Sequence, residues 1–80
     1  MEYNDIMQLV CKVLTEEFEI DPALLQPNAL LQKDLGLDSL DWVDLIVVIY
    51  EEFGFKPTQE ELKDIKTLNN LCTFIAKHNV

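Results

Sequence analysis

Residues 34–55 read DLGLDSLDWVDLIVVIYEEFGF, and this stretch decides the fold. Asp38 is a good helix N-cap, and Asp41, three residues later, resembles the acidic arm of a capping box. Gly54 is typical of the residue at which a helix stops in the left-handed conformation. The stretch therefore predicts a helix over Ser39–Phe53, with a serine in its first turn.

This helix is apolar on two sides, whereas a helix of a small domain normally has one apolar stripe. One stripe contains Trp42, Leu45, Ile46, Ile49 and Phe53, and the other contains Leu40, Val43 and Val47. The carboxylates of Asp41, Asp44 and Glu51 flank the second stripe and would be costly to bury without partners. We therefore expect the first stripe in the core. Two interpretations of the second stay open: it meets the loop before the helix, or it docks onto an apolar, basic groove of a partner.

The rest of the chain predicts three further helices. Apolar residues at three-and-four spacing predict a helix over residues 2–17, and shorter patterns predict helices over 59–64 and 68–77, the last capped by Thr67. No segment shows the alternation of a strand. The expected fold is all-α, a small four-helix bundle with three longer helices and one short, in a single domain of residues 1–80.

A long segment separates the first two helices and is interrupted by Pro22 and Pro27. It carries apolar residues of its own, namely Ile20, Leu24, Leu25, Leu30, Leu31 and Leu35. We expect these side chains to hold the loop against the helices, with a short helical turn over 22–25.

The charge is strongly acidic. Fifteen acidic residues and six basic ones give a net charge of −9, and residues 34–55 contain six acids and no lysine. Such a surface disfavours nucleic acids and anionic membranes and favours partners with basic patches. The N-terminus, MEYNDIMQLV, lacks the apolar core of a signal peptide, and no apolar run approaches membrane-spanning length. These patterns predict a cytoplasmic protein that does not insert into membranes.

Ser39 is the residue whose role needs an explanation. A nucleophilic serine needs a base within hydrogen-bond reach, but the only histidine is His78, at the end of the chain. A calcium-binding EF-hand loop is excluded because Gly36 falls at the wrong position and leucines interrupt the ligand series. An exposed hydroxyl at a helix start could instead carry a covalent group, whose phosphodiester would face free N–H groups. The simpler alternative is that Ser39 only helps to cap the helix.

The two cysteines offer no recognised motif. Cys11 and Cys72 have neither zinc-binding nor CxxC spacing, and both fall on apolar positions of helical patterns. We expect both to be small buried hydrophobic residues. A disulfide between them stays open as an alternative, although it would be unusual in a reducing compartment. No metal site and no catalytic residue is predicted.

The stretch DLGLDSLDWVDLIVVIYEEFGF resembles the phosphopantetheine attachment region of acyl carrier proteins. Upstream, IDPALLQPNALLQKDLGLDSL resembles the ordered loop of that family. Downstream, DIKTL at residues 64–68 resembles the junction into its last helix. The resemblance covers nearly the whole chain, at the family's length and acidity.

The resemblance implies a function for Ser39. A phosphopantetheinyl transferase would attach 4′-phosphopantetheine from coenzyme A to this serine, with Asp38 as the helix cap beside it. The thiol of the arm would hold acyl groups as thioesters, which a monomeric carrier without catalytic residues shuttles between acyl-processing enzymes. The family's recognition helix matches Leu40, Asp41, Val43, Asp44, Val47 and Glu51, which are therefore the expected partner-binding residues.

Three features depart from the family's pattern. Trp42 is bulky where the family often has a smaller residue, Tyr50 stands where the fatty-acid type usually has an acid, and FKPTQ places its proline unusually. These departures keep a specialised pathway open beside fatty-acid synthesis. The pattern is more similar to carriers of fatty-acid and type II polyketide biosynthesis than to D-alanyl or peptidyl carriers. An unmodified acidic helical domain that only binds proteins is the alternative from another class.

Overall fold

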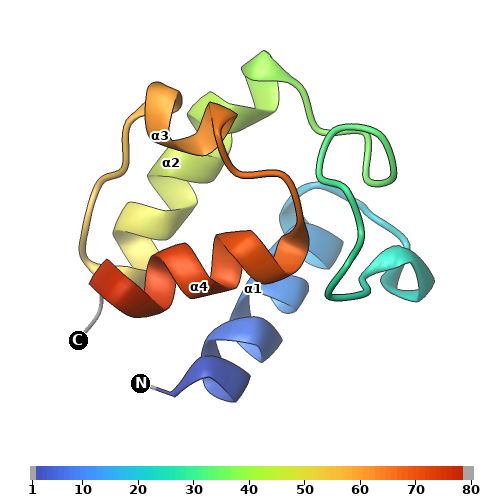
Figure 1. The fold of residues 1–80 in the computed structure, drawn as a ribbon, viewed down its shortest axis with the longest axis horizontal. Coiled ribbons are helices and arrows are strands. Elements are labelled where there is room, and N and C mark those ends of the chain that lie inside the picture. Colours follow the sequence, from blue (N-terminus) through green and yellow to red (C-terminus); the bar gives the residue numbers. More distant parts are fainter. Residues whose placement is uncertain (1, 79–80) are drawn as a thin grey trace.

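The computed structural model describes residues 2–78, which form four α-helices (Figure 1). These are α1 (Tyr3–Glu17), α2 (Ser39–Phe53), α3 (Gln59–Lys63) and α4 (Leu68–His78), and a 3-10 turn, η1 (Pro22–Leu24), lies in the long first loop. The described residues contain no strand, only an isolated bridge between Leu30 and Thr67. The predicted all-α bundle is confirmed.

The helix boundaries agree with the sequence patterns to within one residue. Helix α2 begins and ends as predicted, whereas α1 begins at Tyr3 because Glu2 has extended dihedral angles (φ −85°, ψ 163°) and is the N-cap. Helix α3 ends at Lys63 and α4 continues to His78, one residue from each expected end. The predicted cap of α4 is present, because the Thr67 hydroxyl accepts a hydrogen bond from the Asn70 amide.

The start of α2 is fixed by a complete capping box. One carboxylate oxygen of Asp38 accepts from the amides of Leu40 (3.0 Å) and Asp41 (3.2 Å). In return, the Asp41 carboxylate accepts from the Asp38 amide (3.0 Å). At the other end Gly54 has φ +81°, a left-handed backbone conformation that residues other than glycine seldom adopt. The length of α2 is therefore set by local chemistry at both of its ends.

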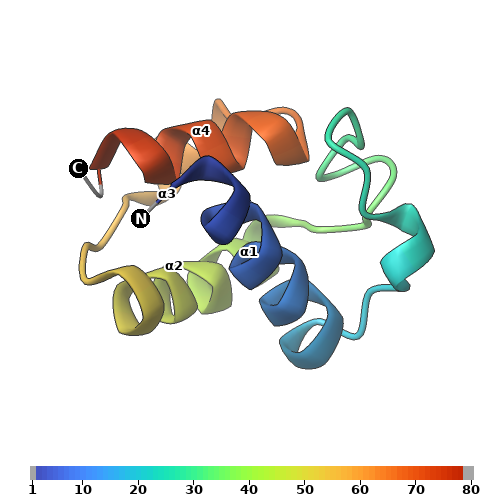
Figure 2. The ribbon, with the colours of Figure 1, turned by 90° about the horizontal axis from the view of Figure 1, so that it is seen from below.

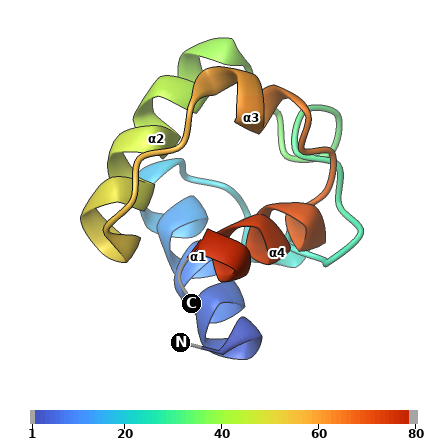
Figure 3. The ribbon, with the colours of Figure 1, turned by 60° about the vertical axis from the view of Figure 1, so that its left-hand side comes forward.

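Helices α1 and α4 lie side by side, and α2 packs on the same core with α3 against it (Figures 2 and 3). The core side of α2 is the stripe expected from the sequence, since Trp42, Leu45 and Ile49 are each 2% exposed and Ile46 is 8% exposed. They meet apolar residues of the other helices, chiefly Ile6, Val10, Leu14, Leu62, Leu68, Leu71, Cys72 and Ile75. Bulky Trp42 is thus a central core residue.

The first loop is held largely by its backbone. The amides of Leu31, Leu68 and Asn69 donate to the carbonyls of Lys66, Ala29 and Pro27, at 2.8–3.0 Å, so the loop runs beside the entrance to α4. Ile20, Leu31 and Leu35 are buried as expected. The expectation for two others is wrong, because Leu24 is 47% and Leu30 38% exposed. Leu30 forms an isolated backbone bridge with Thr67 and its side chain is exposed, while the next residue, Leu31, begins a turn and is buried.

Lysine substitutions on the two sides of α2 should have opposite effects on stability. Replacing Ile46 with Lys places a charge in the core and should lower the free energy of unfolding by about 3–5 kcal/mol, enough to unfold a small domain. Replacing half-exposed Val43 with Lys should change it by less than about 0.5 kcal/mol. Urea unfolding followed by circular dichroism measures both. Unfolding of the Val43→Lys protein, or normal stability of the Ile46→Lys protein, would mean that the two faces are assigned the wrong way round.

A second prediction concerns the cap of α2. Asp38→Ala removes the acceptor for two backbone amides and should cost about 1 kcal/mol of stability. Asp38→Asn is the matched control, because asparagine is an equally good N-cap residue, and it should retain most of that stability. Equal loss in both variants in urea unfolding would show that the charge, and not the cap, is what matters.

Candidate functional site

Ser39 is the first residue of α2 and its side chain is exposed. Helix α2 starts at one edge of the molecule, where the loop from residue 34 reaches it (Figure 1). The capping box holds the backbone on both sides of this serine. Its hydroxyl is therefore both accessible and anchored on a rigid element, which suits covalent attachment of a long, flexible group.

The expected cradle of free N–H groups around Ser39 is mostly absent, and this corrects the sequence-based picture. The amides of Leu40 and Asp41 donate to the Asp38 side chain, and the amide of Trp42 donates to the Asp38 carbonyl (3.1 Å). The chain itself thus takes up donors that an anion would otherwise use. A phosphodiester on Ser39 would sit beside the carboxylates of Asp38 and Asp41. The ester bond to the serine oxygen, and not hydrogen bonds from the helix, would hold it there. The rest of the arm would then be free to extend into solvent.

The outer side of α2 forms an exposed apolar stripe next to Ser39. Leu40 is 78%, Val43 47% and Val47 49% exposed, which excludes the alternative that the first loop covers them. Asp44 and Glu51 are exposed along the stripe, and Asp41, engaged in the capping box, is half-buried. The structure thus brings together Ser39, Asp38 and all six residues expected to bind partners.

Tyr50 belongs to this face, although it was not among the residues expected there. It is 56% exposed and follows Val47 by three residues, so it lengthens the apolar stripe by almost one turn. The signal was present in the sequence, because positions 40, 43, 47 and 50 follow helical spacing. We use "docking stripe" below for Leu40, Val43, Val47 and Tyr50.

One apolar hollow between the described helices is very small. Its volume is about 10 Å³, roughly that of one water molecule, and its lining is entirely apolar. It lies between α1, α2 and α4, and its lining residues are Val10, Val13, Leu45, Val48, Ile49, Phe53, Leu71 and Ile75. An alkyl chain could enter the bundle only if these helices moved apart.

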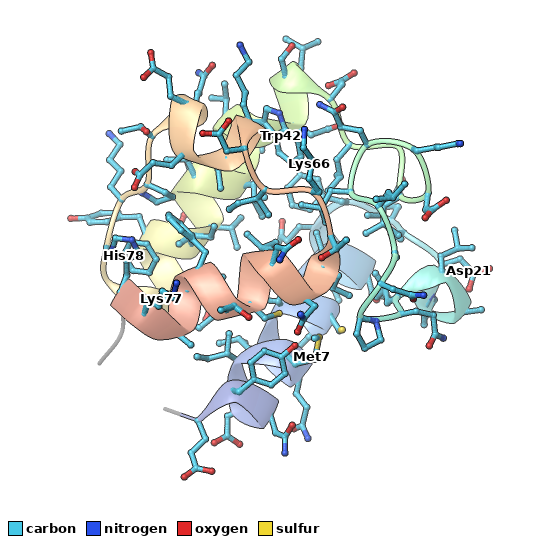
Figure 4. The ribbon with its side chains drawn as sticks, viewed as in Figure 1. Met7, Asp21, Trp42, Lys66, Lys77 and His78 are labelled. Carbon is cyan, nitrogen blue, oxygen red and sulfur yellow. The ribbon has the colours of Figure 1, made fainter. Side chains whose placement is uncertain are left out.

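The residues beside Ser39 do not form a catalytic centre. His78 stacks on Phe55 with ring centroids 4.9 Å apart and also contacts Phe74. Phe55 follows the other end of α2, roughly 20 Å from Ser39 along a helix of this length. Figure 4 shows His78 at the end of α4. Within residues 2–78 there is also no group of three histidine, cysteine or carboxylate side chains placed to hold a metal ion.

Of the helices that the structure describes, none has both the length and the apolar character needed to cross a bilayer.

Comparison with known proteins gives a consistent result. Residues 5–75 match the family model described as "Phosphopantetheine attachment site". The chain is 35% identical over 75 residues to an acyl carrier protein of Thermosynechococcus vestitus, covering 94% of this chain and 93% of that protein. It is also 35% identical over 78 residues to the mitochondrial acyl carrier protein 2 of Arabidopsis thaliana, covering 98% of this chain and 62% of that protein.

The family model spans most of the chain, and the match to the Thermosynechococcus protein spans nearly all of both proteins. The family in question carries 4′-phosphopantetheine as a covalent prosthetic group, and an exposed serine on a capped helix fits that group. The chain therefore belongs to the acyl carrier protein family and has 4′-phosphopantetheine as its prosthetic group.

Proposed function

We propose that Ser39 is the attachment site of the prosthetic group, and that the protein carries acyl intermediates as thioesters between the enzymes of a biosynthetic pathway. The observation that carries this proposal is the position of Ser39, an exposed hydroxyl in the first turn of α2 beside an exposed apolar stripe. A phosphopantetheinyl transferase would join the hydroxyl oxygen to the phosphate next to the pantetheine of coenzyme A. The hydroxyl proton is lost, the pyrophosphate bond of coenzyme A breaks, and adenosine 3′,5′-bisphosphate leaves.

The bound group supplies a thiol on a long, flexible chain, which holds an acyl group as a thioester. The protein's own residues have other tasks. Asp38 fixes the helix start and so the position of the serine. The carboxylates beside Ser39 are engaged in the capping box, and His78 lies beyond the other end of α2, so we infer a carrier and not an enzyme. The surrounding carboxylates repel the phosphodiester and favour an arm that points away from the surface.

The docking stripe and its carboxylates form the surface for partner enzymes. Acidic residues attract basic patches over a distance and speed the encounter, while apolar side chains supply the contact. Tyr50 adds a large side chain with a polar tip, of the kind that is enriched at binding hot spots. We infer that partners present an apolar groove with basic rims, and that they dock next to the arm that they act on.

The acidic pattern of residues 34–55 favours fatty-acid or type II polyketide biosynthesis over D-alanyl and peptidyl carriers. Tyr50, exposed where an acid is expected for the fatty-acid type, supports a carrier with partners of its own. We further infer a cytoplasmic monomer, in keeping with its charge of −9. The competing function, an unmodified interaction domain, would use the same stripe without any arm.

Loading of the arm tests both candidates. Incubation with coenzyme A and a phosphopantetheinyl transferase should add one phosphopantetheine to the chain, seen in the intact mass, and Ser39→Ala should add none. Ser39→Thr is a useful companion, because it keeps a hydroxyl and tests whether the transferase needs a primary one. An unmodified wild-type chain would favour the interaction domain, and an arm on the alanine variant would place the site elsewhere.

The docking stripe is tested by charge substitution. Val43→Lys should keep the fold yet reduce kcat/KM for the phosphopantetheinyl transferase by about tenfold, since 1.4 kcal/mol of lost contact corresponds to that factor. Leu24→Lys is the matched control, because Leu24 is a leucine of the first loop with the same 47% exposure as Val43. Circular dichroism of both variants verifies the fold. An equal effect of the two substitutions would mean that α2 is not the docking surface.

A further inference from the structure

Half of the lysines of this acidic chain gather around one hollow. Its volume is about 140 Å³, and its lining residues are Leu30, Gln32, Lys33, Lys63, Ile65 and Lys66. The chain has fifteen acidic residues, yet none of those that the structure describes lines this hollow. By contrast, the lining of the hollow beside the docking stripe includes Glu17, Asp44 and Glu51. The site with the three lysines, called the lysine hollow below, has no task in the carrier function.

Two chain segments form the lysine hollow, and backbone hydrogen bonds hold them together. One is part of the first loop, and the other leads from the end of α3 into α4, where Figure 4 labels Lys66. The Leu31 amide donates to the Lys66 carbonyl (2.9 Å), and Leu30 forms an isolated bridge with Thr67. The lysines therefore extend from a backbone that is fixed on both sides of the hollow.

The three ammonium groups are available to a ligand. All three lysines are exposed, and within residues 2–78 no side-chain hydrogen bond involves a lysine. The acids next to them in the chain are Asp34 and Asp64, and neither lines the hollow. The Asp34 carboxylate accepts from the Leu30 amide (2.8 Å), so it is engaged with the backbone. The lining thus carries positive charge without a countercharge.

The chemistry of the lining decides which ligand fits. Ammonium groups only donate hydrogen bonds, and the side-chain amide of Gln32 adds two further N–H donors. Planar carboxylates suit the fork of arginine, whereas lysine binds phosphate as a point charge. A phosphate monoester has close to two negative charges at pH 7 and three acceptor oxygens. We propose that the lysine hollow binds the phosphate group of a small molecule, either free phosphate or a phosphate monoester.

The size and the apolar part of the lining agree with this ligand. A single water needs only about 10–15 Å³ of such space, so 140 Å³ readily admits the five heavy atoms of a phosphate group. Leu30 is 38% exposed and Ile65 is half-buried, so both present apolar surface in the hollow. This surface could contact the organic part of an ester, which free phosphate lacks.

The net charge of −9 opposes the approach of an anion, but screening limits this effect. The Debye length at physiological ionic strength is about 8 Å, and the molecule extends over 28 × 24 × 21 Å. Lysines in contact with the ligand therefore outweigh the acids on distant parts of the surface. Exposed charge pairs are individually weak, so we expect binding in the range of about 1–10 mM that weakens further as salt is added.

The test is a titration of the full chain, loaded with its arm, followed by the NMR shifts of its backbone amides at constant ionic strength. The probes are inorganic phosphate and phenyl phosphate, which are mainly dianions at pH 7.5. Dimethyl phosphate, a monoanion, is the control ligand. Both dianions should give saturable shifts at Gln32, Lys63 and Ile65, and dimethyl phosphate should bind about tenfold more weakly. Tighter binding of phenyl phosphate identifies an ester as the ligand, and equal binding identifies free phosphate.

Single substitutions assign the lysines. Lys63→Gln and Lys66→Gln should each weaken the binding of both dianions by about fivefold, the loss expected for one exposed charge contact. Lys56→Gln is the matched control, because it removes the same charge from an exposed lysine that does not line the hollow. It should bind as the parent does. All three side chains are exposed, so we expect each variant to fold, which circular dichroism verifies.

The outcomes are distinct. Saturable shifts at the walls of the hollow, weakened in Lys63→Gln and Lys66→Gln but not in Lys56→Gln, support the site. Three results would overturn it: no saturable shift with either dianion, shifts centred on the docking stripe, or an equal loss of affinity in all three variants. Dimethyl phosphate that binds as tightly as inorganic phosphate would also contradict it, since the site would then not distinguish a dianion. None of these results depends on the role proposed for Ser39.

Discussion

The structure depends on one constraint: α2 is apolar on two sides, and a domain of this size can cover only one of them. The side with Trp42 becomes the centre of the core, and the side with Val43 stays in water. Burial of the second side is opposed by Asp44 and Glu51, whose charges would lose their hydration. The other helices can therefore pack in one arrangement only, with the docking stripe outside. The surface proposed for partners and the core that holds the fold are therefore two faces of the same helix.

The position of Ser39 follows from the same helix. A capping box needs an extended residue immediately before the first turn, and Asp38 fills that place with two hydrogen bonds to the backbone. The next residue, Ser39, is therefore the first residue of the helix, and its side chain is exposed. Local sequence thus positions the candidate attachment site without any long-range contact. This is why the position of the candidate site could be predicted from a short stretch, while the chemical role proposed for Ser39 rests on the resemblance to a family.

Features that depend on contacts distant in sequence were harder to predict. Helix α2 was predicted to the residue, since its caps are local, but Leu24 and Leu30 were wrongly expected to be buried. Leu30 is set by a backbone bridge to Thr67, which no local pattern reveals. The expectation of free N–H groups around Ser39 was also wrong. Capping and anion binding compete for the same donors, and the carboxylate of Asp38, which is part of the chain, already accepts from two of them. Apolar periodicity predicts which face is buried; it does not predict which polar group takes each donor.

The way the helices are joined bears on how this family's cargo could be accommodated. Among the described residues, the side-chain hydrogen bonds between different helices join α1 to α4, from Tyr3 to Asn69 and from Cys72 to Met7. The side-chain hydrogen bonds of α2 all lie within its own cap, so α2 meets the other helices through apolar side chains.

Apolar contact is non-directional, and a similar contact can form with an alkyl chain, which gains about 0.8 kcal/mol for each CH₂ removed from water. Moving α2 away from the α1–α4 pair therefore breaks no side-chain hydrogen bond, and the apolar surface that it exposes is what an entering chain would cover.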